Sequence, residues 1–396
     1  EKEVINMNFT PLGSFLDHLT GNVGIPTAEI RVHRNGKELF SYGSGSIDPA
    51  APLYNMYSMS KPITCAAALS LFEKGKFQLA EPLYEYMPEF REMTVKKHFS
   101  DSGEGMSVAQ GKITGSENTD FEVVKAENPI LIEHLFTMSE GFNYDKESEN
   151  IKQKICDTDG KFPTRMIAKA LSEQPLDFEP GAHWQYSLCH DVLAAFVEVV
   201  SGKRFSDYVA ETIFEPLGMT NSFFHPTEAD YSRIAKQYRY NTDTKKTTEI
   251  QKTNHLVLGS EYDSGGAGII STVDDYIKFA DAMANGGTSF DGTRILSRSA
   301  VDLMRTNRLT AQQLPDFNWP QLRGYGYGLG VRTLIDRAYG GSLSPHGEFG
   351  WGGAAGSYIM IDPENRISAV YGQHMLNNLE PYVHTRIRNI IYGCIL

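Results

Sequence analysis

The stretch Tyr57-Ser58-Met59-Ser60-Lys61-Pro62 opens an apolar run that continues to Phe72 and is followed by Gly75. This pattern predicts a helix, and the proline is tolerated because it lies in the first turn. Residues three apart share one helix face, so the side chains of Ser58 and Lys61 can meet. A serine hydroxyl is a weak nucleophile at neutral pH, and a lysine desolvated at a helix start can serve as its base. The free N–H groups of a helix start can also hold an oxyanion.

The same spacing has an ordinary explanation. A chain of 396 residues contains roughly one Ser-x-x-Lys by chance at average residue usage, and Ser58/Lys61 is the only one here. Taken alone, the motif fits an amphipathic helix without a catalytic role. Its interpretation therefore depends on the segments around it.

Two β-hairpins are predicted, one on each side of this helix. In both, strand-like segments flank a tight turn, which is typical of paired antiparallel strands. The first joins residues 29–33 to 37–40 through Asn35-Gly36, and the second joins 357–361 to 367–371 through 362–365. Helical spacing precedes the first hairpin from Leu12 to Leu19, and a helical pattern follows the second from Tyr382 to Ile395.

Helical patterns dominate the middle of the chain. One of them runs from Asp191 to Val200 and is closed by Gly202. We therefore predict an α/β (α+β) fold in which an antiparallel sheet flanked by helices is built from both termini, with a mostly helical domain inserted between them. The predicted boundaries are 1–80 with 251–396 for the α/β domain and 81–250 for the inserted domain. The polar, Gly/Ser-rich stretch Lys96–Glu127 is expected to be a surface excursion.

Composition excludes several classes of function. Apolar residues make up 41% of the chain and the net charge is −12, so a sizeable core is expected and a nucleic-acid partner is not. No apolar run is long enough for a membrane span. The first ten residues show no secretory signal, so a cytoplasmic location is the expectation. Four scattered cysteines, and the lack of a metal-binding, P-loop or Rossmann pattern, predict no metal and no cofactor. The expected partner is a small molecule, and the oligomeric state stays open.

Two further segments can carry chemistry. Tyr186 lies in the loop His183–Leu188, and a tyrosine beside a cation can relay protons; the alternative is an aromatic anchor in the core. The run Phe349–Gly356 holds Trp351, Gly352, Gly353 and Ala354 just before a predicted strand. Glycines let a ligand approach the backbone, whose N–H groups can hold an oxyanion; the alternative is a β-bulge or a tight strand entry.

These three segments, in this order, resemble the serine β-lactamase and penicillin-binding-protein superfamily, whose signatures are Ser-x-x-Lys, a Tyr-x-Asn or similar loop, and a Lys-Thr-Gly strand. The class C β-lactamase-like branch, and within it the family VIII carboxylesterases, is the most similar. The resemblance extends over most of the chain. Further similar segments are Ile132–Phe142, Pro216–Met219, Gly268–Thr272 and Tyr325–Gly330.

The resemblance implies a role for each residue. Ser58 is the expected nucleophile, with Lys61 and Tyr186 as its proton-transfer partners. The N–H groups of Ser58 and Ala354 are expected to hold the oxyanion. The expected substrate-binding residues are Trp351, Gly352, Gly353 and Tyr144.

Two departures from the β-lactamase pattern indicate the substrate. Tyr186-Ser187-Leu188 has leucine where β-lactamases carry asparagine, and Trp351-Gly352-Gly353 stands in place of Lys-Thr-Gly. Both changes are similar to the family VIII esterase pattern. The sequence thus predicts hydrolysis of short- to medium-chain acyl esters. The alternatives are a β-lactamase, a D-amino-acid peptidase, an acyltransferase of the same fold, or a catalytically inactive binding protein.

Overall fold

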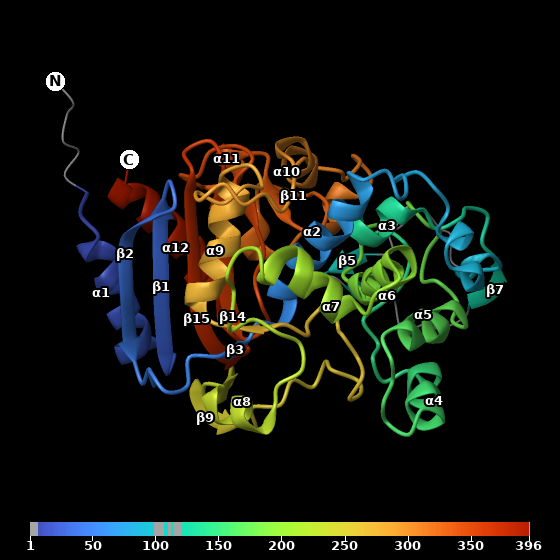
Figure 1. Ribbon diagram of the computed structural model, residues 1–396, viewed down its shortest axis with the longest axis horizontal. Coiled ribbons are helices and arrows are strands. Elements are labelled where there is room, and N and C mark those ends of the chain that lie inside the picture. Colours follow the sequence, from blue (N-terminus) through green and yellow to red (C-terminus); the bar gives the residue numbers. More distant parts are fainter. Residues whose placement is uncertain (1–6, 99–106, 110–111, 115–120, 396) are drawn as a thin grey trace.

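The structure is a computed structural model that describes residues 7–98, 107–109, 112–114 and 121–395. Its main sheet runs in the order β11-β12-β13-β14-β15-β1-β2 (Figure 1). The neighbours along this path are antiparallel. The strands are β1 (Thr27–Arg34), β2 (Lys37–Gly45), β11 (Tyr325–Tyr327), β12 (Arg332–Leu334), β13 (Phe349–Gly350), β14 (Gly356–Asp362) and β15 (Ile367–Leu376).

Both predicted hairpins are confirmed, and they join the two ends of the chain. β1 pairs with β2, β14 pairs with β15, and β1 pairs with β15 in the centre of the sheet. The turn of the first hairpin needs positive φ at Asn35 (54°) and Gly36 (68°), which is the geometry that Asn-Gly adopts most readily. The register Ile30↔Tyr371 and Val32↔Ala369 turns apolar side chains of both strands toward one face.

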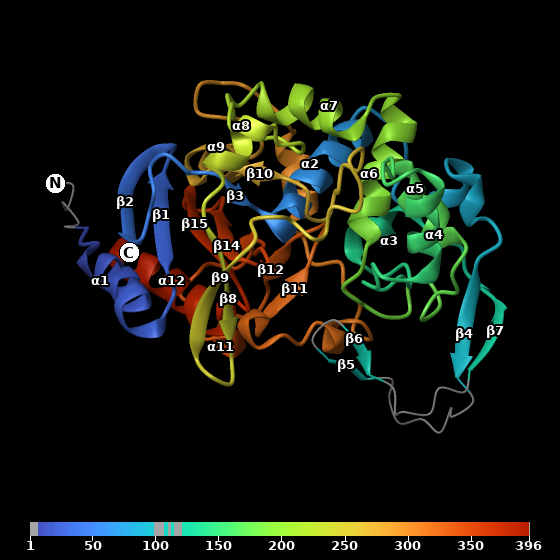
Figure 2. The ribbon, with the colours of Figure 1, turned by 90° about the horizontal axis from the view of Figure 1, so that it is seen from below.

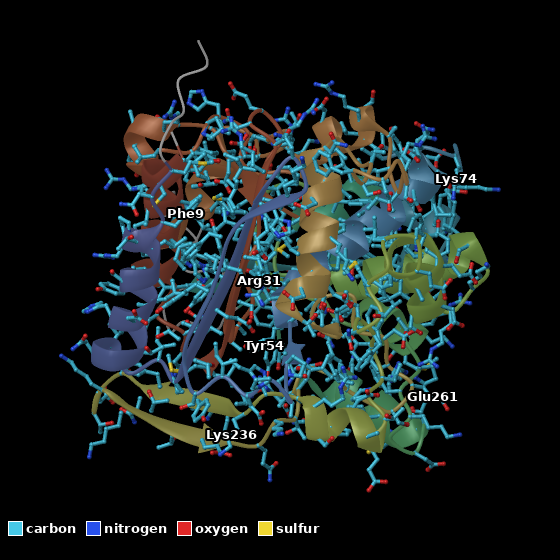
Figure 3. All side chains as sticks on the ribbon, turned by 60° about the vertical axis from the view of Figure 1, so that its left-hand side comes forward. Phe9, Arg31, Tyr54, Lys74, Lys236 and Glu261 are labelled. Carbon is cyan, nitrogen blue, oxygen red and sulfur yellow. The ribbon has the colours of Figure 1, made fainter. Side chains whose placement is uncertain are left out.

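Helices cover both faces of the sheet, and each face has its own apolar core. α1 (Thr10–His18) and α12 (Glu380–Ile395) pack with β1 and β15 around Leu16, Ile30 and Ile387. On the opposite face, α9 (Val273–Ala284) packs against β1, β14 and β15 (Figure 2). Arg31 of β1 donates to Asp274 of α9 at 2.7 Å, and Figure 3 labels Arg31 on this side.

Most of the remaining helices gather beside the sheet, on the right in Figure 1. α2 (Ser60–Phe72) is the centre of this group, because it packs on α6 (Cys189–Ser201), whose C-cap is Gly202 with φ 70°. The others are α3 (Ile132–Thr137), α4 (Glu149–Asp157), α5 (Arg165–Ser172), α7 (Phe205–Val209), α8 (Glu228–Arg233), α10 (Arg298–Met304) and α11 (Arg337–Gly340).

Short strands complete the fold. β8 (Gln237–Asn241) pairs in parallel with β15 and antiparallel with β9 (Lys246–Ile250), while β3 (Tyr54–Asn55) pairs with β10 (Ile270–Ser271). β8 therefore ties the end of the stretch 81–250 to the main sheet. The division of the chain at residues 80 and 250 remains a proposal, and the fold class, an antiparallel sheet flanked by helices, is confirmed.

The excursion Lys96–Glu127 contains strands that its sequence did not predict. β4 (Thr94–His98) pairs with β7 (Phe121–Lys125), and β5 (Ser107–Ala109) pairs with β6 (Lys112–Thr114). Residues 99–106, 110–111 and 115–120 lie outside the described part of the chain, as do 1–6 and 396. Across the described ranges, no helix is both long and apolar enough to cross a membrane.

Candidate active site

Ser58 lies in a single 3-10 turn, Tyr57–Met59, immediately before α2. Its side chain is 7% exposed and lines a cavity of about 700 Å³. The preceding residue, Tyr57, has φ 48°, which is unusual for a residue with a Cβ. The Tyr57 hydroxyl donates to Gln237 at 3.1 Å, so a contact from β8 holds this strained residue in place. Strained backbone of this kind is often found where a side chain must be presented to a ligand.

Lys61 is fully buried in the first turn of α2. Its Nζ donates to the Gly266 carbonyl at 2.7 Å and to Ser58 Oγ at 3.2 Å. The same nitrogen lies 4.7 Å from the ring centroid of Tyr186 and 5.5 Å from that of Tyr144. The predicted meeting of Ser58 and Lys61 on one helix face is therefore present in the structure.

Tyr186 completes a three-residue cluster with Ser58 and Lys61. Its hydroxyl donates to Ser58 Oγ at 2.6 Å. The Tyr186 ring stacks on Tyr144 at 5.3 Å and on Trp351 at 6.0 Å, with interplanar angles of 3° and 15°. Tyr144 packs on the Tyr186 ring and is not among the residues that line this cavity, so its predicted role in substrate binding stays a prediction.

The loop between β13 and β14 brings the strand edge against the serine turn. Gly353 donates to the Ser357 carbonyl at 2.7 Å, and a Cβ at position 353 would lie 2.4 Å from the Met56 carbonyl oxygen. Only glycine fits this approach. The next residue, Ala354, lines the cavity together with Ser58. The amides of Ser58 and Ala354 have no acceptor within the described part of the chain, so both are free to donate to a ligand.

Asn378 fixes this loop, and sequence reasoning did not find it. Its Nδ2 donates to the carbonyls of Gly353 and Ala354 at 3.1 and 3.0 Å. Its Oδ1 accepts from the Glu380 amide at 2.9 Å, at the start of α12. The only available signal was a polar Asn-Asn pair between a strand and a helix, which is also an ordinary helix entry.

Aromatic side chains make the apolar wall of the cavity. Trp351 is 3% exposed and contacts Tyr327 and Trp319, with ring centroids 5.2 and 5.9 Å apart. Trp319, Trp351 and Tyr186 all line the cavity, together with Leu322. Among the described residues, His, Cys, Asp and Glu form no group of three that could hold a metal ion.

The model of the β-lactamase family matches this chain over residues 12–390. The chain belongs to the β-lactamase family. This confirms the resemblance drawn from the sequence motifs.

Two relatives and one solved structure are similar to this chain over most of its length. An uncharacterised protein of Mycobacterium tuberculosis is 30% identical over 343 residues, which are 83% of this chain and 80% of that protein. Esterase EstB of Burkholderia gladioli is 24% identical over 360 residues, 84% of this chain and 81% of that protein. The structure of EstCE1, a hydrolase with promiscuous acyltransferase activity, has a TM-score of 0.73 and 22% identity over 97% of this chain and 98% of its own.

Asp191 is a second residue that the motifs of the β-lactamase family did not reveal in this chain. It is buried on α6, and its Oδ1 accepts from the hydroxyls of Tyr262 at 2.7 Å and Ser264 at 2.6 Å. A Cβ at Gly266 would lie 2.5 Å from Asp191 Oδ2. Asp191 thus holds the loop whose Gly266 carbonyl accepts from Lys61.

Glu140 is a buried carboxyl group behind Tyr186. Its Oε1 accepts from the hydroxyl of Ser187, the residue that follows Tyr186, and its Oε2 has no partner within the described chain. Burial raises the pKa of Glu140 to about 8, because the charged form loses its hydration.

We expect Glu140 to make the protein less stable as pH rises. Between about pH 4.5 and pH 8 the unfolded chain loses the proton at this position while the folded protein keeps it. The free energy of unfolding therefore falls as the pH rises toward the pKa of folded Glu140. This residue lowers it by about 1.4 kcal/mol per pH unit. Glu140→Gln should show a smaller fall in the free energy of unfolding between pH 5 and pH 8, measured by urea titration of both proteins. Parallel pH curves would contradict this assignment.

Proposed function

We propose that this protein is a serine carboxylesterase that hydrolyses short- to medium-chain acyl esters through an acyl-enzyme on Ser58. The observation that carries the proposal is the contact of one hydroxyl with two proton-transfer partners: Ser58 Oγ lies 3.2 Å from Lys61 Nζ and 2.6 Å from the Tyr186 hydroxyl. The cavity beside Ser58 has an apolar aromatic wall. The name of the Burkholderia relative, an esterase, supports the same choice.

In the first half of the reaction, Ser58 Oγ bonds to the ester carbonyl carbon and its proton passes to the Lys61/Tyr186 pair. The two groups share one hydroxyl and act as a coupled unit. The carbonyl oxygen becomes an oxyanion, which the amides of Ser58 and Ala354 stabilise; one such donor is worth about 100- to 1000-fold in rate. The carbon–alkoxide bond then breaks, and the pair returns the proton to the departing alcohol.

In the second half, water attacks the acyl-enzyme. The pair accepts the proton of the water, a second oxyanion forms between the same two amides, and the bond from the acyl carbon to Ser58 Oγ breaks. The proton returns to Ser58 and the carboxylic acid leaves. The same residues therefore serve both halves.

A fluorophosphonate probe tests for a live nucleophile. We expect one equivalent of label, located on Ser58 by peptide mass mapping, and hydrolysis of a chromogenic butyrate ester that stops in step with labelling. An unlabelled protein would favour the alternative of a catalytically inactive binding protein.

Acyl transfer is the second candidate. The reported promiscuous acyltransferase activity of EstCE1 favours it, because an alcohol in the cavity can replace water in the second half of the reaction. Product analysis with added butanol separates the two activities. An esterase releases mainly free acid, whereas an acyltransferase forms mainly butyl ester.

Trp351 is expected to set the preference for neutral esters over β-lactams. An indole stands where β-lactamases place a lysine, so a carboxylate beside the scissile bond loses a charge-assisted hydrogen bond of about 1.5–3 kcal/mol. This corresponds to roughly a 10- to 150-fold loss in affinity. We expect kcat/KM for a neutral butyrate ester to exceed that for a chromogenic cephalosporin on the same enzyme. A cephalosporin value equal to or above the ester value would restore the β-lactamase alternative.

A pair of variants makes this comparison sharper. Trp351→Lys should shift the ratio of kcat/KM values toward the cephalosporin, whereas Trp351→Met, which loses the same ring contacts but carries no charge, should not. An equal shift in both variants would assign the effect to lost packing alone.

A further inference from the structure

The cavity that Ser58 lines also has a set of polar lining residues. They come from β12, β14 and α12, and include Arg332, Tyr358, Glu380, His384 and Arg388. Gly352 lines the same cavity. A Cβ at this position would lie 3.1 Å from His384 Cε1, so glycine leaves room beside the His384 ring.

Two of these lining residues carry buried guanidinium groups. Arg332 is 1% exposed and Arg388 is 3% exposed. Arg332 Nη2 donates to Glu348 at 2.8 Å and to the Tyr358 hydroxyl. Among the described residues, the acceptors of Arg388 are uncharged: the Gln321 carbonyl at 3.2 Å and the Tyr358 hydroxyl at 3.4 Å. One carboxylate is thus in direct contact with the pair of cations.

Three nitrogens of this pair have unused N–H groups. Arg332 Nε, Arg332 Nη1 and Arg388 Nε are buried and have no acceptor within the described residues. Buried polar groups are nearly always hydrogen-bonded, and a buried cation needs a compensating charge. Unused guanidinium donors beside a cavity therefore indicate a missing acceptor.

The other titratable groups leave room for an anion. Burial lowers the pKa of His384 to about 3, so this residue is neutral at pH 7. Its Nε2 atom lies 3.0 Å from the Gly356 carbonyl oxygen. The oxygens of Glu380 accept from Gln321 and Asn378, and burial raises the pKa of Glu380. Tyr325 donates to the second oxygen of Glu348.

We propose that Arg332 and Arg388 form a subsite for a carboxylate group of the substrate in the cavity that Ser58 also lines. A guanidinium presents its donors in a planar fork that matches a carboxylate. A cavity of about 700 Å³ accommodates an ester longer than a simple butyrate. The inference rests on the proposed function for the position of the ester group. It concerns a carboxylate several bonds from the scissile carbonyl, whereas Trp351 disfavours one beside it.

The kinetic test uses matched pairs of esters. 4-Nitrophenyl hydrogen glutarate and its methyl ester carry the charge or its neutral equivalent on the acyl side; 4-butyryloxybutanoate and its methyl ester carry it on the alcohol side. We expect the acid to exceed its methyl ester in kcat/KM by roughly 10-fold or more in one pair, and that pair identifies the side that enters the subsite. An advantage in neither pair would overturn the proposal.

Variants of two arginines on the same helix provide the control. Arg388→Gln should remove the advantage of the acid, and Arg388→Lys, which keeps the charge but not the planar fork, should reduce it. Arg386→Gln should leave the advantage unchanged, because Arg386 is exposed and contacts Tyr382. Equal losses in the Arg386 and Arg388 variants would contradict a specific subsite.

A binding measurement keeps this inference separate from the proposed function. Glutarate should bind to the Ser58→Ala protein in calorimetry, and Arg388→Lys in the same background should weaken that binding by at least about 10-fold. Binding without ester hydrolysis by the wild type would retain the subsite and remove the esterase proposal. The absence of glutarate binding from both the wild type and Ser58→Ala would remove the subsite.

Discussion

Ser58→Ala is expected to abolish ester hydrolysis, with a loss of more than about 1000-fold in kcat/KM. The substitution removes the atom that bonds to the acyl carbon, and Tyr186 and Lys61 cannot replace it because in the proposed mechanism they only transfer protons. The Ser58 side chain borders the cavity, so water can take over its two hydrogen bonds. The free energy of unfolding should therefore change by no more than about 1 kcal/mol. Activity of more than a few per cent of wild type in a clean preparation would rule out this nucleophile.

Ser60→Ala is the matched control. Ser60 is fully buried, and its Oγ accepts from the Ile269 amide at 3.0 Å. Its removal leaves a buried N–H without an acceptor, which costs about 1–3 kcal/mol of stability. We expect the opposite result from that of Ser58→Ala: substantial activity with a lower midpoint of urea unfolding. Loss of activity in both variants with retained stability would make the two serines indistinguishable and contradict the assignment.

Lys61→Met and Tyr186→Phe are expected to lower kcat by about 100-fold or more each, and the double variant should be little worse than either single one. Both groups act on the proton of the same hydroxyl, so removing one already disables the relay. Methionine is chosen because Lys61 is fully buried, and an alanine would add a cavity to the lost chemistry. Phenylalanine keeps the ring that stacks on Tyr144 and Trp351.

The measurement is single-turnover acylation with a chromogenic ester in all four proteins. Losses in log kcat that add strictly in the double variant would show that Lys61 and Tyr186 act independently, and the shared relay would be wrong. Circular dichroism and urea midpoints separate loss of catalysis from loss of fold.

Local patterns were sufficient for the two hairpins of the main sheet and for the first contact of the site. The Asn35-Gly36 turn predicts its hairpin because both turn residues need positive φ, and few residue pairs other than Asn-Gly adopt it readily. The spacing of Ser58 and Lys61 predicts their contact because helix geometry alone brings them together. Such signals lie within a few residues of the groups they position.

The remaining contacts join residues that are distant in the sequence. These contacts depend on how whole elements dock. Asn378 donates to the Ala354 carbonyl, Lys61 donates to the Gly266 carbonyl, and β8 pairs in parallel with β15. Nothing in the local pattern of a polar pair or a glycine distinguishes these positions from ordinary turns. The stacking of Tyr144 on Tyr186 was not predicted for the same reason, since it is a tertiary contact.

The close approach of Gly353 to Met56 has a consequence for how activity arises during folding. It brings together the amides of Ser58 and Ala354, which come from opposite halves of the chain, and Asn378 secures the loop from still further along. A partly synthesised chain therefore carries Ser58 without its second oxyanion donor. Contacts of such long sequence separation are slow to form, so under the proposed mechanism Ser58 should remain inert until the β14–β15 hairpin has docked on β1, and any recovery of ester hydrolysis on refolding should follow that docking.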